Sequence, residues 1–228
     1  MRLFPPMAKS RRSFLGAGIA AASLGACEPF GVDYKTMKTA LAVATGLEDP
    51  PGITLEQASA VPYASVGIRL GGSGEAMLIL ASDTGGTLLW TSSERIAITT
   101  KDGRIVASGG FQWNLSHLGF PSGDPLAGNL NDEKPAPSAL RIFDFQDVNR
   151  FSVPVDGLFE VRGPEKISVL GTELETTAVI ETCTCRTFDW SFKNVFWIDR
   201  ESGVVWRSRQ SIHPNLPPIT TTVLRPPG

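Results

Sequence analysis

The fold is decided by the stretch 187–193, which reads Thr187-Phe188-Asp189-Trp190-Ser191-Phe192-Lys193 and alternates aromatic with polar side chains. Successive side chains of a β-strand point to opposite faces, so this alternation predicts a strand with one apolar face. We expect the strand to run over 187–198. A strand of this kind is typical of an antiparallel sheet that packs one face on a core.

The same period of two extends in both directions from this stretch. The strands that we expect elsewhere are 65–70, 76–81, 88–91, 96–98, 105–107, 140–145, 151–155, 158–162, 166–170, 173–182 and 204–212. Asp102-Gly103 between two of them is a strong hairpin signal, and no helix long enough for a parallel crossover separates the strands. We therefore predict an all-β fold, an antiparallel meander of roughly ten strands that forms a curled sheet or open barrel.

Three segments interrupt this pattern. Residues 34–47 carry apolar side chains at helical spacing, and Thr54-Leu55-Glu56-Gln57 has the sequence of a helix cap, so we expect two short N-terminal helices. Residues 114–139 lack any period and hold four prolines, which predicts a long loop. Pro154 favours an edge position for the strand at 151–155.

The N-terminus has the three parts of an export signal. Basic residues precede thirteen weakly apolar residues, 14–26, and the junction Leu24-Gly25-Ala26-Cys27 resembles a bacterial lipobox. We expect residues 1–26 to be removed and Cys27 to carry acyl chains, followed by a tether over 27–34 and a single β-rich domain over 35–228. The alternatives are an ordinary secretory signal with an incidental Cys27, or a membrane span, for which about 20 residues would be needed.

The residues around the signal suggest a route and a destination. Ser10-Arg11-Arg12-Ser13-Phe14-Leu15-Gly16 resembles the twin-arginine motif, which implies export of an already folded chain. A general secretory signal with two arginines is the competing interpretation. Glu28, which follows Cys27 directly, is the residue expected for outer-membrane sorting. We therefore expect a periplasmic lipoprotein on the outer membrane.

The charge balance excludes some classes of partner. The chain has 21 Lys and Arg against 23 Asp and Glu, and four of the basic residues lie in the leader, which holds no acid. The mature chain is therefore mildly acidic, and it gives no electrostatic footprint for nucleic acid or for anionic membrane surfaces. Membrane attachment is expected through the lipid on Cys27, because each buried methylene contributes about 0.8 kcal/mol.

Cys183 and Cys185 leave two alternatives open. Residues i and i+2 of a flat strand lie about 6.6 Å apart, at the outer edge of the disulfide range of about 4.4–6.8 Å. A bulge at Thr184 would permit a disulfide, and otherwise the two thiols are buried on the same side. No His or further Cys lies nearby to complete a tetrahedral metal site, so no metal or cofactor is expected.

Few residues suggest a binding or catalytic site. Trp113, Trp190, Trp197 and Trp206 could form an aromatic platform for sugar rings or an acyl chain, although aromatic residues first serve cores. Asp83-Thr84-Gly85 resembles the active-site turn of retroviral-type aspartic proteases, but Ser-Asp-Thr-Gly-Gly is also what an exposed turn requires. His117 and His213 are expected at the surface or in loops. We therefore expect no catalytic residues.

A family resemblance becomes visible once the strands are placed. The resemblance rests on the lipobox and on the order along the chain of the segments 61–65, 90–92, 99–109, 194–199 and 203–210. This set is similar to the YjbF/GfcB family of lipoproteins linked to capsule and exopolysaccharide formation. The resemblance implies an all-β lipoprotein that is an accessory in polysaccharide assembly or export, with no catalytic residues. The twin-arginine signal and the Cys183/Cys185 pair are not features of that family.

Two functional hypotheses follow. The first is an adaptor that docks exopolysaccharide-export proteins or the polysaccharide itself. The second is a carrier that holds a lipid or glycan in a concave β-sheet. A carrier requires a deep apolar concavity, whereas an adaptor requires an exposed surface, so the interior of the folded chain distinguishes them.

Overall fold

A computed structural model describes residues 52–127 and 138–228. All of these residues belong to one compact unit, 49–228. The signal, Cys27, the tether and the helix predicted over 34–47 lie outside the described residues.

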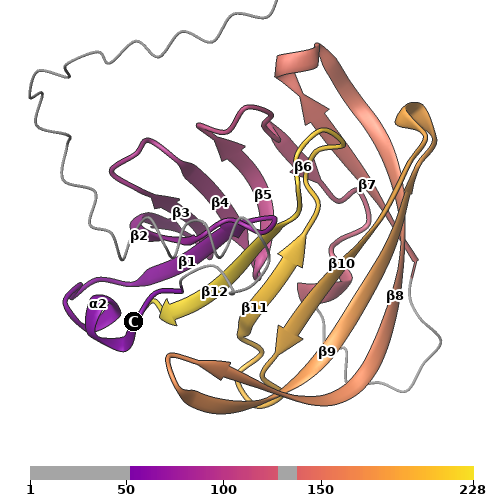
Figure 1. Cartoon of the computed structure of the whole chain (residues 1–228). Coiled ribbons are helices and arrows are strands. Elements are labelled where there is room, and N and C mark those ends of the chain that lie inside the picture. Colours follow the sequence, from indigo (N-terminus) through magenta and orange to yellow (C-terminus); the bar gives the residue numbers. More distant parts are fainter. Residues whose placement is uncertain (1–51, 128–137) are drawn as a thin grey trace, which may run out of the picture. The chain divides into compact units, whose positions relative to one another are not determined.

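The described residues form one antiparallel sheet with very little helix (Figure 1). Its twelve strands are β1 Ser65–Leu70, β2 Glu75–Thr84, β3 Thr87–Thr91, β4 Ala97–Lys101, β5 Arg104–Gly109, β6 His117–Gly119, β7 Ser138–Phe145, β8 Arg150–Val169, β9 Thr172–Cys185, β10 Trp190–Ile198, β11 Val205–Gln210 and β12 Ile219–Arg225. The helical elements are α2 Leu55–Ser59 and the short 3₁₀ turns η1 Pro125–Ala127, η2 Gln146–Val148 and η3 Arg186–Phe188. The predicted all-β antiparallel fold is confirmed.

The last strand joins two meanders into a single sheet. The strand order is β5-β4-β3-β2-β1-β12-β11-β10-β9-β8-β7-β6, so β12 lies between β1 and β11 and pairs antiparallel with both. Alternation does not predict this strand, because its segment Ile219-Thr220-Thr221-Thr222-Val223 does not alternate apolar with polar residues. The inward side chain of Thr221 instead meets Ser208 of β11 through a hydroxyl–hydroxyl hydrogen bond of 2.6 Å.

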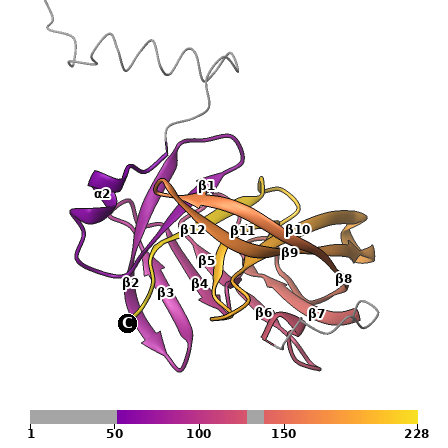
Figure 2. The ribbon, with the colours of Figure 1, turned by 90° about the horizontal axis from the view of Figure 1, so that it is seen from below.

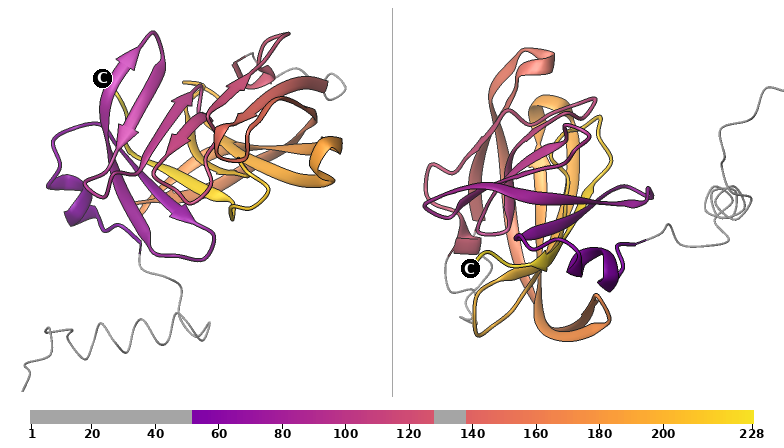
Figure 3. Two further views of the ribbon diagram at one scale, coloured as in Figure 1. Left: turned by 90° about the horizontal axis from the view of Figure 1, so that it is seen from above. Right: turned by 90° about the vertical axis from the view of Figure 1, so that its left-hand side faces the viewer.

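The sheet curls until its two ends meet. Although β5 and β6 stand at opposite ends of the strand order, they come side by side (Figure 2), and Figure 3 shows the same curvature from two other directions. The backbone N–H of Ser108 in β5 donates to the carbonyl oxygen of Leu115, just before β6, at 2.7 Å. Gln210 of β11 reaches across to β5, where it accepts from Ile105 N–H at 3.0 Å and donates to Gly103 O at 2.9 Å.

Three predicted strands between 151 and 170 form one long strand, β8. A register shift between Val161 and Gly163, where Gly163 has a φ of +108°, bends β8 without ending it. The pairing of β8 with β9 begins only at Asp156, so Pro154 lies in an end of β8 that pairs with β7 alone. This end of β8 has one unpaired side, which is enough to accommodate a residue without a backbone N–H donor. Pro154 therefore does not mark a separate strand at the edge of the sheet.

Two further segments differ from the prediction. Residues 186–188 form the turn η3 and Asp189 adopts a φ of +48°, so the strand expected over 187–198 begins at Trp190. The segment 114–139, expected to be a loop, contains β6 and η1, and β7 begins at Ser138. The helix predicted from Thr54 is present as α2, with both hydrogen bonds of the capping box.

The core fills the inside of the curled sheet. Its main cluster includes the fully buried Leu78, Ile98, Leu115 and Phe145, and a smaller cluster contains Phe159, Val179 and Phe196. Burying each side chain of this size contributes about 1.5–3 kcal/mol. Phe188, Trp190 and Phe192, the aromatic residues of the opening stretch, all pack against the main cluster.

Candidate functional site

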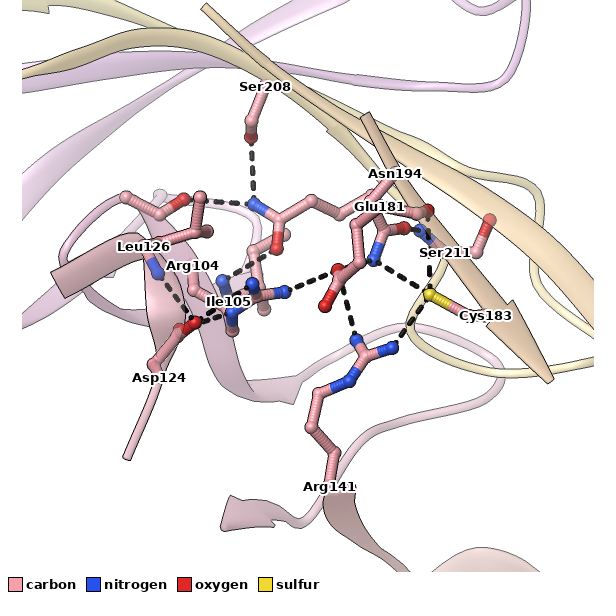
Figure 4. A network of polar contacts seen from close by, with 12 residues as sticks. Arg104, Ile105, Asp124, Leu126, Arg141, Glu181, Cys183, Asn194, Ser208 and Ser211 are labelled. Carbon is pink, nitrogen blue, oxygen red and sulfur yellow. Dashed lines mark hydrogen bonds and ion pairs between the residues drawn. The ribbon is translucent and has the colours of Figure 1, made fainter. Parts of the chain in front are cut away.

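A network of charged and polar side chains lies inside the sheet (Figure 4). It joins strands that are far apart in the chain, with Arg104 at the start of β5, Arg141 on β7, Glu181 on β9 and Asn194 on β10. The strand alternation places Arg141 and Glu181 on the inward faces, where their neighbours at i±2 are buried as well. All four side chains are at most 2 % exposed.

Glu181 is the centre of this network. One of its carboxylate oxygens, Oε2, accepts hydrogen bonds from Arg104 at 2.8 Å, Arg141 at 3.1 Å and Asn194 at 2.8 Å. Arg104 also forms a two-pronged ion pair with Asp124, whose side chain is 13 % exposed. Two arginines thus face two carboxylates, and the buried charges balance.

The electrostatics of the network stabilise its ionised form. Burial by itself would raise the pKa of Glu181, but the charges of Arg104 and Arg141 outweigh burial and hold that pKa below its usual value. The pKa of Arg104 lies above its usual value, because Glu181 and Asp124 outweigh the opposite effect of burial. Burial raises the pKa of the Cys183 thiol to about 12, although Arg141 donates to its sulfur at 2.7 Å. A thiol this hard to ionise is a poor nucleophile.

The network is a structural device that ties four strands together. Glu181 Oε1 and Arg141 Nε have no hydrogen-bond partner among the described residues, and both atoms face Gly157 on β8. A Cβ added at Gly157 would lie 3.1 Å from that oxygen and 3.0 Å from a terminal nitrogen of Arg141. The close approach of these two charged groups therefore depends on a glycine at this position.

The two cysteines are separate buried thiols. The pairing of β9 with β8 and β10 is regular through Thr184, so the bulge that a disulfide would need is absent there. The disulfide considered for Cys183 and Cys185 is therefore not formed in this structure. Both side chains point inward from β9 into the main core cluster.

The four tryptophans considered for an aromatic platform do not gather in one place. Trp113 stacks on His213, and Trp190 stacks on Phe192 with ring centres 3.8 Å apart, both against the main core cluster. Trp197 on β10 and Trp206 on β11 are half-buried and belong to neither core cluster. Trp197 lies directly opposite Arg207 across the β10–β11 pair.

Asp83 and His213 take up structural positions. The Asp83 carboxylate is exposed and accepts from Gly86 N–H at 2.9 Å within its own hairpin turn. His213, expected at the surface or in a loop, lies in the loop between β11 and β12 but is only 1 % exposed, because this segment folds inward beside Phe145 and Trp113. Burial lowers the pKa of His213, and Asp147, with Oδ1 at 3.8 Å from Nε2, opposes that shift. His117 on β6 is exposed.

The described residues contain neither a cluster of metal ligands nor a membrane-spanning helix. In residues 52–127 and 138–228, no three His, Cys, Asp or Glu side chains come together as a metal site. No helix in this part of the chain combines the length and apolar character needed to cross a membrane.

A pocket of about 420 Å³ on the outer face of the sheet brings two other arginines together. We call it the arginine pocket. Its floor consists of Arg69 on β1, Thr220 and Thr222 on β12 and Arg207 on β11. The end of the β8–β9 hairpin, Ser168–Leu170, forms one wall, and it reaches the neighbourhood of β11 and β12 in Figure 1. The remaining lining residues are Ile53, Glu75 and Leu224.

The lining of the arginine pocket holds two arginines and one carboxylate, Glu75, which lies directly opposite Arg69 across the β1–β2 pair. Among the described residues, no carboxylate oxygen lies within 4.0 Å of a guanidinium nitrogen of Arg69 or Arg207. Arg207 donates only to neutral groups, to Ser168 O at 2.6 Å and to Thr222 Oγ1 at 3.4 Å. The one carboxylate of the lining, Glu75, accepts from Ile53 N–H at 3.0 Å and extends over Gly67.

The sequence contained a signal for the buried network but not for the arginine pocket. Glu181 and Arg141 occupy inward positions of strands whose other inward residues are apolar, so a charge in that register indicates a buried ion pair. Arg69 and Arg207 occupy outward positions, where charged residues are ordinary. Only the pairing of β12 with both β1 and β11 brings these two arginines together.

Known proteins resemble this chain over most of its length. The family described as group 4 capsule polysaccharide lipoprotein gfcB, YjbF matches residues 34–224. The lipoprotein GfcB of Escherichia coli K12 is 23 % identical over 171 residues, which cover 75 % of this chain and 80 % of GfcB. The lipoprotein YjbF of the same organism is 25 % identical over 181 residues, covering 77 % and 82 %. The crystal structure of the hypothetical lipoprotein YmcC from Escherichia coli K12 has the same fold, with a TM-score of 0.68, 22 % identity and coverage of 83 % of this chain and 95 % of YmcC.

Proposed function

Because the chain belongs to the YjbF family of group 4 capsule polysaccharide lipoproteins, we propose that it is a non-catalytic accessory protein in exopolysaccharide or capsule assembly and export. In this proposal Cys27 carries the acyl chains that hold the protein to the periplasmic face of the outer membrane. The folded sheet is then a platform that docks export proteins or the polysaccharide.

The observation that carries the proposal is the packed interior of the sheet. Core side chains and the network around Glu181 occupy most of the inside of the curled sheet, and a pocket of about 370 Å³ beside Trp90, Gly103 and Val205 opens to the surface. A carrier needs an apolar cavity in which an acyl chain or glycan is shielded from water. An interior of packed side chains and paired charges favours an accessory protein that works through its outer surface, and it disfavours the carrier alternative.

The position of the reactive groups also favours a non-catalytic role. The Cys183 thiol is buried and its pKa is raised to about 12. The Asp83 carboxylate is bound within its own turn. A catalytic site needs a nucleophile or an acid–base pair that substrate can reach. The Cys183 thiol is buried away from substrate, and the exposed Asp83 carboxylate is engaged by the backbone of its own turn.

Deletion of the gene tests the proposal. We expect the deletion strain to secrete less polysaccharide than the parent, measured as uronic acid and total hexose in the culture supernatant. Wild-type protein restores secretion, and a Cys27→Ser variant, which cannot be acylated, does not. Unchanged secretion in the deletion strain would count against the proposal. Full restoration by the Cys27→Ser variant would remove the anchor from it.

A further inference from the structure

The arginine pocket is built for a ligand with a negative charge. Two half-buried guanidinium groups and the single carboxylate of Glu75 line one space, so the lining has an excess of one positive charge and no carboxylate of the described residues forms an ion pair with either arginine. Burial lowers the pKa of Arg207, Glu75 and Glu165 oppose that shift, and Arg69 adds to it. An anion between the two arginines would offset the cost of burial, because hydrogen bonds to a charged partner are roughly twice as strong as neutral ones.

Donor groups remain available in the pocket. A guanidinium has five N–H donors, and the two hydrogen bonds of Arg207 to Ser168 and Thr222 leave donors for a ligand. The pocket is also lined by the side chain of Thr220 and by Ser168. The planar guanidinium group of arginine binds a carboxylate with two parallel hydrogen bonds.

The size and the walls of the pocket fit a sugar ring better than a bare ion. A volume of about 420 Å³ falls within the usual range of small-molecule sites, about 300–1,000 Å³. Val169, Leu170 and Leu224 add apolar surface to the lining, beside the charged and hydroxyl groups. A sugar acid presents C–H groups to such a wall, hydroxyls to the threonines and one carboxylate to the arginines.

We propose that the arginine pocket binds an acidic sugar residue, a hexuronate unit of a polysaccharide, through Arg69 and Arg207. This inference rests on the proposed function for the source of its ligand and names the class of that ligand. The pocket lies on the outer wall of the sheet, so a sugar unit within a long polymer can occupy it while the rest of the polymer continues along the surface.

Calorimetric titration of the purified full chain with D-glucuronate tests the inference. We expect D-glucose, which has the same ring without the carboxylate, to bind at least about tenfold more weakly, the effect of one charge-assisted hydrogen bond. Arg69→Gln and Arg207→Gln are each expected to weaken glucuronate binding by about tenfold. Equal binding of glucose and glucuronate would overturn the inference.

Arg209→Gln is the matched control. Arg209 is exposed on the same strand as Arg207, pairs with Thr220 and does not line the pocket. Its substitution removes the same charge and should leave glucuronate binding unchanged. Loss of binding equal to that of Arg207→Gln would show a general charge effect and reject the site. Thermal unfolding identifies any variant that is destabilised, and Arg69→Gln, which removes no hydrogen bond between described residues, remains informative if Arg207→Gln loosens the β8–β9 hairpin.

Two further titrations distinguish other sources of negative charge. In one titration inorganic phosphate is added to the same protein, and in the other vesicles containing phosphatidylglycerol are added. Binding of either one more tightly than glucuronate, with the same dependence on Arg69 and Arg207, would assign the pocket to phosphate groups and overturn the sugar inference.

The deletion strain separates this inference from the proposed function. If deletion lowers secretion and the double variant Arg69→Gln/Arg207→Gln restores it fully, the pocket has no part in the role and the inference fails alone. If deletion has no effect on secretion, the proposed function fails, whatever the titrations show.

Discussion

At the scale of single residues, Glu181 is the side chain on which most of the buried interior depends. It balances Arg104 and Arg141 through one oxygen atom, and all three side chains are at most 1 % exposed. Breaking a buried ion pair by removing one partner costs more than the pair itself contributes, because the other charge stays buried. The network is therefore stable as a set and fragile to single changes.

Glu181→Gln is expected to lower the free energy of unfolding by about 3–5 kcal/mol. The amide keeps the shape of the side chain but leaves Arg104 paired with Asp124 alone and Arg141 without a carboxylate partner among the described residues. Urea denaturation followed by tryptophan fluorescence measures the change. Glu160→Gln, on the exposed face of β8, is the control and should stay within about 0.5 kcal/mol of the wild type. Equal effects in both variants would contradict the role given to Glu181.

Gly157→Ala tests the contact between backbone and charges. The added Cβ would lie 3.0 Å from a nitrogen of Arg141 and 3.1 Å from Glu181 Oε1, so the ion pair must shift, at an expected cost of about 1–3 kcal/mol. Gly109→Ala on β5 is the matched control, because nothing lies within 4 Å of its new methyl group. Thermal unfolding of the two variants should separate them clearly, and similar midpoints would refute the argument.

The burial of His213 predicts a pH dependence of stability. Its folded pKa lies below the ordinary 6.5, so the unfolded chain binds more protons, and stability decreases as the pH falls from about 6.5 through the folded pKa. Glu181, with a folded pKa below 4.5, adds a second loss at lower pH, again as the pH falls.

The variant His213→Asn should lose the first of these two windows and keep the second. The Asn side chain can still accept the hydrogen bond that Nδ1 now receives from Asn215 N–H at 3.0 Å. Denaturation curves recorded between about pH 4 and 8, a span that includes the range in which histidine titrates, measure the effect. The same substitution at the exposed His117 serves as control, and an unchanged profile in His213→Asn would contradict the prediction.

At the scale of elements, the strand β12 holds the sheet together. It pairs with β1 on one side and with β11 on the other, so its loss would leave open edges at β1 and β11, although the two meanders would still meet at β5 and β6. Exposed strand edges pair with other chains and promote aggregation.

A chain that ends after Pro218 is therefore expected not to fold as a monomer. Circular dichroism should show no cooperative thermal transition, and size-exclusion chromatography should show aggregates. A chain that ends after Arg225 is the control, because residues 226–228 follow β12 and are exposed. A cooperative transition in the shorter chain would mean that β12 is dispensable.

The sequence predicted the class of elements better than their connections. Alternation of apolar and polar residues was sufficient to find most strands, because each has one face on the core. It failed at β12, where Thr221 and Thr222 are buried as hydroxyl-bearing residues rather than apolar ones. It also divided β8 at Gly163 and near Pro154, where a bulge and a half-paired end replace the expected turns. The arginine pocket could not be predicted, since it depends on the pairing of β12.

At the scale of the whole molecule, membrane attachment is expected to depend on Cys27 alone. Two or three acyl chains anchor a protein stably, because each buried methylene adds about 0.8 kcal/mol. Cys27→Ser is expected to move the protein from the membrane fraction to the soluble periplasmic fraction, measured by cell fractionation and immunoblotting. Intact-mass measurement of the wild type should show acyl groups on a chain that begins at residue 27. A wild-type mass without acyl groups would contradict the anchor.

The position of β12 in the chain also determines when the sheet can be completed. A ribosome makes the twelve strands from β1 onward, yet the partner that unites β1 with β11 is the last strand to be synthesised. The pairs that β12 forms with β1 and β11 can therefore form only after β12 has left the ribosome. Until β12 is made, the edges of β1 and β11 that it will pair with have unpaired backbone groups. A chaperone that shields these edges at the ribosome exit would therefore be needed most at this stage.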